Sequence, residues 1–380
     1  MRPEENYPKF MEEQVLHYIL PRREERYLSR EPGRKIYCAF YTAGTCDNGT
    51  RGKRSEQIGG KCRMENSGEG SESSSAKGII LISHGFTETA DKYFELIYYF
   101  LKAGYHVCIP EHCGHGWSYR LVEGDLSLVH TDSWQRYVQD LSFAAHAAKK
   151  HWAKDLPLYL FAHSMGGGIG AALAAKEPEL FDRVVLSSPM IRPLTGGVPW
   201  PVTKGIVAVM CLFGRERSYV IGQHAYDGME TFEMGFATSE ARHAWYKEKT
   251  DEEPLYQTSG ASYGWLREAI RLNQFLMKEA WKQIKVPVLL IQAGNETVVS
   301  NEAQAAFVRK LAQKDLTRNG DSRAERQLKT AGGRQQASDS PQQKTEPVRL
   351  ISIPGAKHEI FRSEDETLEK YLKYVLNMYE

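Results

Sequence analysis

The sequence has no long hydrophobic run. Its longest apolar stretch, residues 205–213, falls well short of the roughly 20 residues that a membrane-spanning helix needs. The first residues, Met-Arg-Pro-Glu-Glu-Asn, hold no apolar core of the kind found in signal peptides. The six cysteines form no Cys-x-x-Cys pair, so we expect reduced thiols. We expect a cytoplasmic protein whose only membrane contact is peripheral, at the inner face of the membrane.

An excess of charge of one sign is also missing. The chain carries 49 basic and 48 acidic residues and no long basic patch, so we expect no nucleic-acid partner. Hydrophobic residues make up 41% of the 380 residues, enough for a large core. Two segments, residues 42–77 and 314–347, are polar and of low complexity, and we predict disordered insertions there.

The most informative stretch is residues 156–178. A short apolar run leads into Ala162-His-Ser-Met-Gly166, and an Ala-rich helical pattern follows and stops before Pro178. A serine on a tight strand-to-helix turn is the nucleophile elbow of an α/β-hydrolase. The residues two before and two after the serine must be small, and here they are Ala162 and Gly166. The pattern predicts that Ser164 is a nucleophile.

Apolar runs of strand length alternate with helical patterns along much of the chain. This alternation predicts a mostly parallel sheet covered by helices on both faces. We expect an amphipathic lead-in over residues 1–20. The strands and helices that we predict after it are given by their residue ranges. The strands are 25–30, 35–41, 78–83, 105–110, 158–162, 182–188, 286–292 and 348–353; the helices are 91–103, 133–151, 301–313 and, with a capping box of Ser363 and Glu366, 363–379.

Residues 190–283 break the alternation, being helical and rich in aromatics without a clear buried strand. We predict a helical cap here, inserted between two parts of a hydrolase core, residues 1–189 and 284–380. Within the cap, the run 205–213 is interpreted either as an exposed lid face or as a segment packed on the core.

Three candidate catalytic residues each follow a predicted strand. Ser164, Glu296 and His358 occur in the chain order Ser, acid, His of α/β-hydrolases, so all three side chains are expected to meet at one sheet edge. His358 would act as the base, and Glu296 would orient it; a solvated loop position is the alternative for Glu296. The backbone N–H groups of Phe86 and Met165 are the expected oxyanion donors, and His84 and Gly85 are expected to support the loop that holds Phe86.

His112, Cys113 and His115 raise the question of a metal site. Further ligands are not nearby in the sequence, so we favour a glycine-rich turn and expect neither metal nor cofactor.

These segments resemble the lysophospholipase and monoacylglycerol lipase branch of the α/β-hydrolases, and the bacterial inner-membrane lysophospholipases most of all. The resemblance rests on His84-Gly85, the segments 111–118 and 162–167, the strand 286–293 with Glu296, and Gly355-x-x-His358-Glu, with two further segments of the cap, 238–242 and 260–268. Glu111 departs from it, because the family usually has Asp there, as monoacylglycerol lipases do at the position of Glu296.

The resemblance implies hydrolysis of a carboxylic ester in a lipid with one acyl chain. A lysophospholipid is the first candidate substrate and a monoacylglycerol the second. Two alternatives stay open: another hydrolase on this fold, such as an aminopeptidase or thioesterase that uses Glu230, Glu233 and Glu240, and a binding protein that has lost catalysis.

Overall fold

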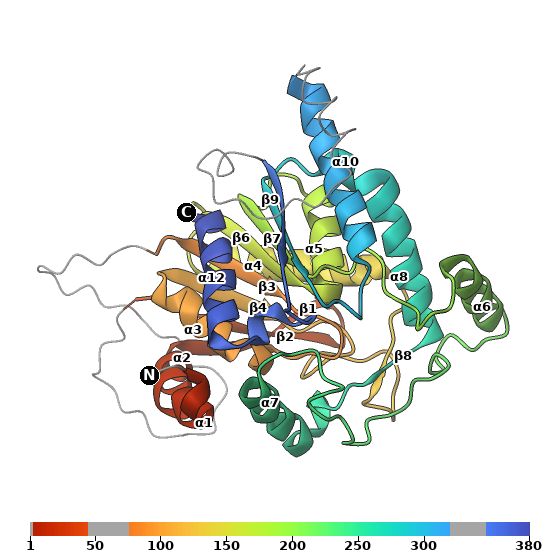
Figure 1. Cartoon of the computed structure of the whole chain (residues 1–380), viewed down its shortest axis with the longest axis horizontal. Coiled ribbons are helices and arrows are strands. Elements are labelled where there is room, and N and C mark those ends of the chain that lie inside the picture. Colours follow the sequence, from red (N-terminus) through yellow and green to blue (C-terminus); the bar gives the residue numbers. More distant parts are fainter. Residues whose placement is uncertain (1–2, 45–75, 320–346) are drawn as a thin grey trace, which may run out of the picture.

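The computed structural model describes residues 3–44, 76–319 and 347–380. At its centre lies an eight-stranded sheet in the order β1-β2-β4-β3-β6-β7-β9-β10 (Figure 1). Only β2 runs antiparallel to its neighbours, β1 and β4; the other pairs are parallel. The strands are β1 (Arg23–Glu31), β2 (Arg34–Tyr41), β3 (Gly78–Ser83), β4 (Tyr105–Pro110), β6 (Leu158–His163), β7 (Arg183–Ser187), β9 (Val288–Ala293) and β10 (Val348–Ile353).

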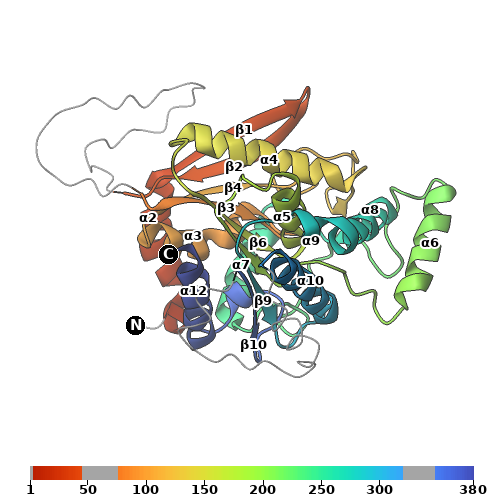
Figure 2. The same ribbon diagram turned by 90° about the horizontal axis from the view of Figure 1, so that it is seen from above.

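Helices cover both faces of this sheet, as Figure 2 shows. One face carries α4 (Trp134–His151), α5 (Ser164–Lys176), α8 (Tyr263–Phe275) and α10 (Asn301–Asn319). The other carries α3 (Phe94–Lys102), α12 (Asp365–Tyr379) and an N-terminal segment of short helical pieces. The pieces are η1 (Pro3–Asn6), α1 (Tyr7–Phe10), η2 (Met11–Leu16), α2 (His17–Ile19) and η3 (Leu20–Arg22).

The sequence period of β3 explains the two layers. Ile79 and Leu81 are buried in the core under α4 and α5, whereas Ile80 and Ile82 are buried in the core under α3 and α12. A strand buried on both faces needs apolar residues at every position, which is why these runs were recognisable. The predicted α/β-hydrolase fold is confirmed.

The N-terminal segment, predicted only as an amphipathic lead-in, is helical. Its apolar positions Tyr7, Met11, Val15 and Ile19 recur every fourth residue and are all buried against the second core. Because this spacing places them on one face of a helix, the segment packs as a continuous strip although its helical type changes along it.

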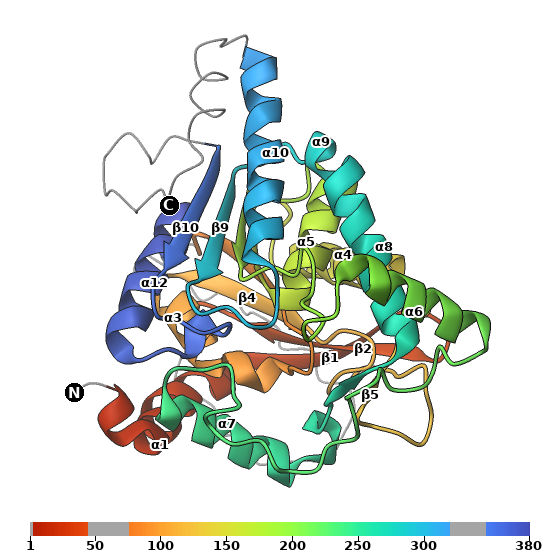
Figure 3. The same ribbon diagram turned by 45° about the vertical axis from the view of Figure 1, so that its right-hand side comes forward.

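The predicted cap contains α6 (Trp200–Leu212) and α7 (Glu240–Glu252), and α7 is followed by η5 (Pro254–Tyr256). In Figure 3 α6 projects from the body, whereas α7 lies beside the N-terminal helices. A two-stranded sheet joins β5 (Leu128–Val129) to β8 (Gly260–Ala261). Beyond β8, the helix α8 and its continuation through η6 (Leu276–Ala280) and α9 (Trp281–Gln283) pack against α5. The division into core and cap at residues 190–283 stays a prediction.

Several predicted boundaries were wrong. The strand expected at 286–292 is β9 (Val288–Ala293), and the helix expected at 91–103 is η4 (Ala90–Tyr93) followed by α3. Two other errors concern helix ends. The helix expected over 301–313 continues to Asn319, so residues 314–319 belong to α10 and not to the predicted insertion. A polar composition does not by itself end a helix, because charged residues are good helix formers. The rest of that insertion, residues 320–346, and residues 45–75 of the first lie outside the described residues.

The second error concerns α12, which begins at Asp365 without a capping box. Its first N–H, that of Asp365, donates to the Glu4 carboxylate (3.0 Å), and η8 (Ile360–Arg362) precedes it.

Among the described residues, no helix combines the length and the apolar character that crossing a bilayer requires.

Candidate active site

The elbow between β6 and α5 has the strained geometry expected of a nucleophile turn. Ser164 adopts φ of +53°, in the left-handed region that few non-glycine residues occupy. The turn presses against the neighbouring strand: a Cβ atom on Gly166 would lie 2.2 Å from the Ser83 carbonyl oxygen. Only glycine fits there, which accounts for the small residue that the sequence pattern demands.

The structure brings Ser164, His358 and Glu296 together at the carboxyl ends of β6, β10 and β9. His358 Nε2 lies 2.7 Å from Ser164 Oγ, and His358 Nδ1 lies 2.8 Å from Glu296 Oε2. A carboxylate can only accept, so Nδ1–H donates to Glu296 and Nε2 is free to accept the Ser164 hydroxyl proton.

Glu296 is held as a charged acceptor and is not a solvated loop acid. Its Oε1 accepts from the N–H groups of Val298 (2.8 Å) and Val299 (3.2 Å). Burial alone would raise the pKa of Glu296, but His358 and these two donors outweigh it, so the pKa lies below its usual range. The carboxylate therefore stays ionised opposite His358.

The loop after β3 lies beside the elbow. His84 Nε2 accepts from the His112 N–H (2.8 Å), and its Nδ1–H donates to the Gly85 carbonyl (2.8 Å), so this ring joins the two loops. Burial lowers the pKa of His84 to about 4, which keeps the ring neutral. Phe86 follows, and its ring lies 4.5 Å from the ring of Trp265 on α8. Met165 is the second residue of α5, at the helix N-terminus, where N–H groups favour negative charge.

Glu111 organises the glycine-rich turn that was weighed as a metal site. Its two oxygens accept from the N–H groups of Ala90 (2.9 Å) and Trp117 (2.6 Å). His112 Nε2 lies 3.0 Å from Ser83 Oγ, and His115 Nδ1 bonds the Cys113 carbonyl at 3.1 Å. No group of three or more metal-ligating side chains occurs in the described part of the chain.

Residues 235–239 of the predicted cap lie against the loop after β10 that carries His358, here called the histidine loop. The Glu359 N–H donates to the Phe236 carbonyl (3.0 Å), and Lys357 Nζ donates to the Gly235 carbonyl (3.1 Å). The ring of Phe236 lies edge-on to His358 at 6.1 Å. The predicted cap thus bonds the two neighbours of His358 through its backbone and faces the His358 ring with Phe236.

The helix α6 bears out part of each interpretation of the apolar run. Only Thr203 and Val207 of this helix are buried. Leu212 is 82% exposed and Phe213, the next residue, 76%, and they extend an exposed apolar face that includes Val202, Ile206 and Val209. The run therefore has two sides: Val207 belongs to the core, with Met210 and Cys211 packed against it, and the opposite side is an exposed apolar face.

Comparison with known proteins places the chain. Residues 74–320 match the family described as serine aminopeptidase, S33. The chain belongs to this hydrolase family. Lysophospholipase L2 of Escherichia coli (strain K12) is 27% identical over 295 residues, which cover 76% of this chain and 76% of that protein. Monoglyceride lipase of Mus musculus is 34% identical over 119 residues, 31% of this chain and 37% of that protein.

Among solved structures, a soluble variant of monoglyceride lipase from Saccharomyces cerevisiae aligns over 97% of both chains with a TM-score of 0.64 and 18% identity, which is a likeness of fold. The predicted resemblance to lysophospholipases and monoacylglycerol lipases is confirmed.

Sequence reasoning missed the charged residues behind the triad. Lys92 forms ion pairs with Glu88 and with Glu359, the residue after His358. The spacing of Glu88 and Lys92, four residues apart, was a signal for the first pair. Glu359 lies far from both in the sequence, and nothing in its local pattern indicates this partner.

Proposed function

We propose that the chain is a serine hydrolase that cleaves the carboxylic ester of a lipid with a single acyl chain, a lysophospholipid first. One observation supports this above all: the bonded series Ser164 Oγ, His358 and Glu296, at 2.7 and 2.8 Å, which is poised for proton transfer. The likeness to lysophospholipase L2 over three quarters of both chains supports the substrate class.

In this mechanism Ser164 Oγ attacks the ester carbonyl carbon while His358 Nε2 takes the hydroxyl proton. The negative charge that develops on the carbonyl oxygen is bound by the N–H groups of Phe86 and Met165. His358 then gives its proton to the alcohol oxygen as the carbon–oxygen bond breaks. Water repeats the attack on the acyl-serine and releases the fatty acid, and Glu296 stabilises the imidazolium form in both halves.

The aminopeptidase alternative needs an acidic pocket for a substrate amino group. Glu230, Glu233 and Glu240 are all exposed, so they do not form one. The intact bonds between Ser164, His358 and Glu296 argue against a binding protein without catalysis. A monoacylglycerol stays the second candidate substrate, favoured by the 34% identity to mouse monoglyceride lipase.

The test is fatty-acid release from a lysophospholipid, a monoacylglycerol and a short nitrophenyl ester by the wild type and Ser164→Ala. We expect all turnover to vanish in Ser164→Ala, with circular dichroism unchanged, and the lysophospholipid to give the highest kcat/KM. Wild-type rates in Ser164→Ala would contradict the nucleophile. Turnover of the short ester alone would keep the triad and reject the lipid substrate.

The exposed face of α6 is proposed to contact the surface of the membrane that holds the substrate. Val202, Ile206, Val209 and Phe213 recur at helical spacing on this face, and exposed apolar patches of this kind mark interaction sites. Arg215 and Arg217 follow the helix and suit anionic lipid headgroups.

We expect the double variant Leu212→Asp/Phe213→Asp to bind vesicles of phosphatidylcholine and phosphatidylglycerol roughly tenfold or more weakly, because each apolar side chain contributes about 1.5–3 kcal/mol when buried. Co-sedimentation measures this. Leu20→Asp is the matched control, because Leu20 is also an exposed apolar residue but lies on the N-terminal segment, away from α6. Equal binding by the wild type and the double variant would contradict the membrane role.

A further inference from the structure

Three loops carry the proposed catalytic groups, and a cluster of buried charges lies where they meet. The loops are the turn after β3 with Phe86, the elbow with Ser164, and the loop after β10 with His358. The cluster consists of Glu88, Lys92, Glu359 and Arg362, whose side chains are 3, 7, 5 and 8% exposed. None of the four belongs to the triad.

Glu88 fixes the turn that presents the Phe86 N–H. Its Oε2 accepts from the Gly85 N–H (2.6 Å) and from the Tyr93 hydroxyl (2.5 Å). The turn needs such support, because Thr87 adopts φ of +57°, a strained conformation for a β-branched residue. Strained backbone persists only where the surroundings hold it, and the Glu88 carboxylate holds this turn from inside.

Lys92 joins this turn to the histidine loop. Its Nζ lies 3.3 Å from Glu88 Oε1 and also donates to Glu359 Oε1. Glu359 directly follows His358, so a single ammonium group connects the carboxylate of the oxyanion turn with the neighbour of the catalytic base. The other oxygen of Glu359 accepts from Arg362 Nη1 at 2.5 Å.

The elbow contacts the same cluster through His163, the residue before Ser164. His163 Nε2 lies 3.5 Å from Glu88 Oε1, and its ring lies 4.9 Å from the ring of His358. Its Nδ1 lies 3.2 Å from the Ser187 carbonyl on β7. Glu88 therefore contacts the oxyanion turn, the elbow and, through Lys92, the histidine loop.

The cluster is electrically balanced, with two carboxylates and two cations. Burial alone would raise the pKa of Glu88, but the Lys92 ammonium and the hydrogen bond from Tyr93 help to hold the pKa below its usual range. Burial likewise opposes the charge of Lys92, but Glu359 and Glu88 outweigh it and raise the pKa of Lys92 to about 12. A buried ion pair is weak evidence for stability, since apolar residues of the same size often stabilise as well. The location of the cluster among three loops fits better with a role in holding the loops in position.

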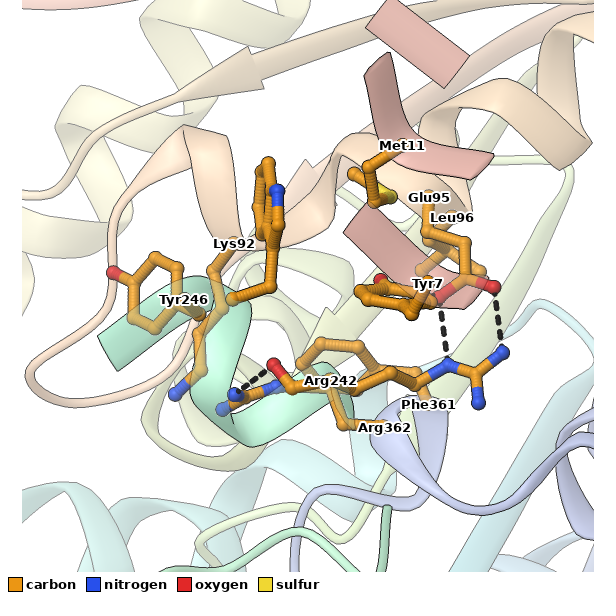
Figure 4. A pocket seen from close by; sticks show the side chains of 10 residues that line it. Tyr7, Met11, Lys92, Glu95, Leu96, Arg242, Tyr246, Phe361 and Arg362 are labelled. Atoms are coloured by element: carbon orange, nitrogen blue, oxygen red, sulfur yellow. Dashed lines mark hydrogen bonds and ion pairs between the residues drawn. The ribbon is translucent and has the colours of Figure 1, made fainter. Parts of the chain in front are cut away.

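The cluster also continues to the cap. Arg362 Nη2 donates to the Arg242 carbonyl on α7 (2.7 Å), and the Arg242 guanidinium pairs with Glu95 of α3 through two bonds of 2.8 Å (Figure 4). In the same view Lys92 and Arg362 extend to one side of a small cavity of about 10 Å³. Hydrogen bonds and ion pairs thus connect α7 to the loop that carries His358.

We propose that Glu88, Lys92 and Glu359 are positioning residues. They fix the relative positions of the oxyanion donor Phe86, the nucleophile Ser164 and the base His358. This inference rests on the proposed function, because it assigns the cluster a role in that reaction. The cluster touches no substrate atom; it acts through the three loops. A displacement of reacting groups by about 1 Å costs about 100-fold in rate, so small shifts of these loops are measurable.

The test compares Glu88→Gln with the wild type on the short nitrophenyl ester. The substitution keeps the size of the side chain and removes the charge that faces Lys92. We expect kcat to fall about 10- to 100-fold while KM stays within about twofold. Affinity for a trifluoromethyl ketone, which adds to the serine as an oxyanion, should fall by the same factor as kcat. Glu359→Gln should act likewise, and the double variant should cost less than the product of the two, because both carboxylates act through Lys92.

The matched control is Asp140→Asn, which removes another buried carboxylate that pairs with Arg30 (2.8 Å) on the far side of the sheet. It should lower the melting temperature and leave kcat unchanged. Wild-type kcat in Glu88→Gln, with Ser164→Ala inactive, would overturn the positioning role alone; turnover by Ser164→Ala would overturn the proposed function itself. Should Glu88→Gln not fold, Glu88→Asp carries the same test, since it keeps the charge and shortens the side chain by one methylene.

Discussion

Glu111 is a buried carboxyl group whose environment favours the protonated form. Burial raises the pKa of Glu111 to about 8, although the N–H groups of Ala90 and Trp117 oppose the shift. Asp91 raises the pKa further and Arg23 lowers it. The native state therefore keeps a proton that the unfolded chain loses above the ordinary value of 4.5. Between these two values the native state binds more protons, so stability must fall as the pH rises.

We expect the free energy of unfolding to fall between pH 6.5 and pH 8, by at most about 1.4 kcal/mol per pH unit from this one group. Glu111→Gln stays neutral throughout, so its stability should fall less over the same interval, even if it is lower at every pH. Urea denaturation of both proteins at three pH values measures the difference. Equal slopes would mean that Glu111 is ionised in the native state.

Among single residues, the sequence predicted the candidate catalytic side chains but not the buried charges that hold their loops. Ser164, Glu296 and His358 could be predicted because each follows an apolar strand and their order fits one fold. Lys92 and Glu359 could not, because an ion pair between residues so far apart in the chain leaves no local pattern. Tertiary contacts alone determine which buried charges meet.

Among the elements, strands were more predictable than helix ends. The strands β3, β4 and β10 have the predicted bounds. The strands β3 and β4 are buried along their whole length, and such strands show as nearly continuous apolar runs. The strand β10 lies at the edge of the sheet and is only partly buried. Helix ends depend on which group satisfies the free N–H and C=O groups. Ser363 and Glu366 fit a capping box by sequence, yet the acceptor for Asp365 N–H is Glu4, more than three hundred residues away.

The apolar face of α6 was visible in the sequence, but its exposure was not. The run from 205 to 213 has the composition of a core helix, and only the structure shows that it packs through Val207, Met210 and Cys211 while its other side is exposed. An apolar helix is normally buried, so composition cannot separate a lid from a core element.

Across the whole molecule, one side chain joins the two ends of the chain and the cap. Glu4 accepts from the Asp365 N–H (3.0 Å) at the start of α12 and from the hydroxyl of Ser239, the N-cap of α7. In return, the Glu4 N–H donates to the Asp365 carboxylate (3.2 Å). Arg242 Nη1 lies 3.6 Å from the Glu4 carboxylate. Glu4 in the first turn of the chain thus bonds to the start of both α7 and α12.

We therefore expect Glu4→Ala to lower the free energy of unfolding by about 1–2 kcal/mol, the usual cost of removing a capping acceptor. Glu12→Ala is the control, because Glu12 lies on the same N-terminal segment and is exposed; it should change stability by less than about 0.5 kcal/mol. Urea denaturation measures both. A further consequence separates this closure from an ordinary cap: amide exchange should quicken in α7 and at the start of α12 together, since Glu4 links them. Equal losses in the two variants, or faster exchange in α12 alone, would mean that Glu4 acts on one helix and does not join the cap to the core.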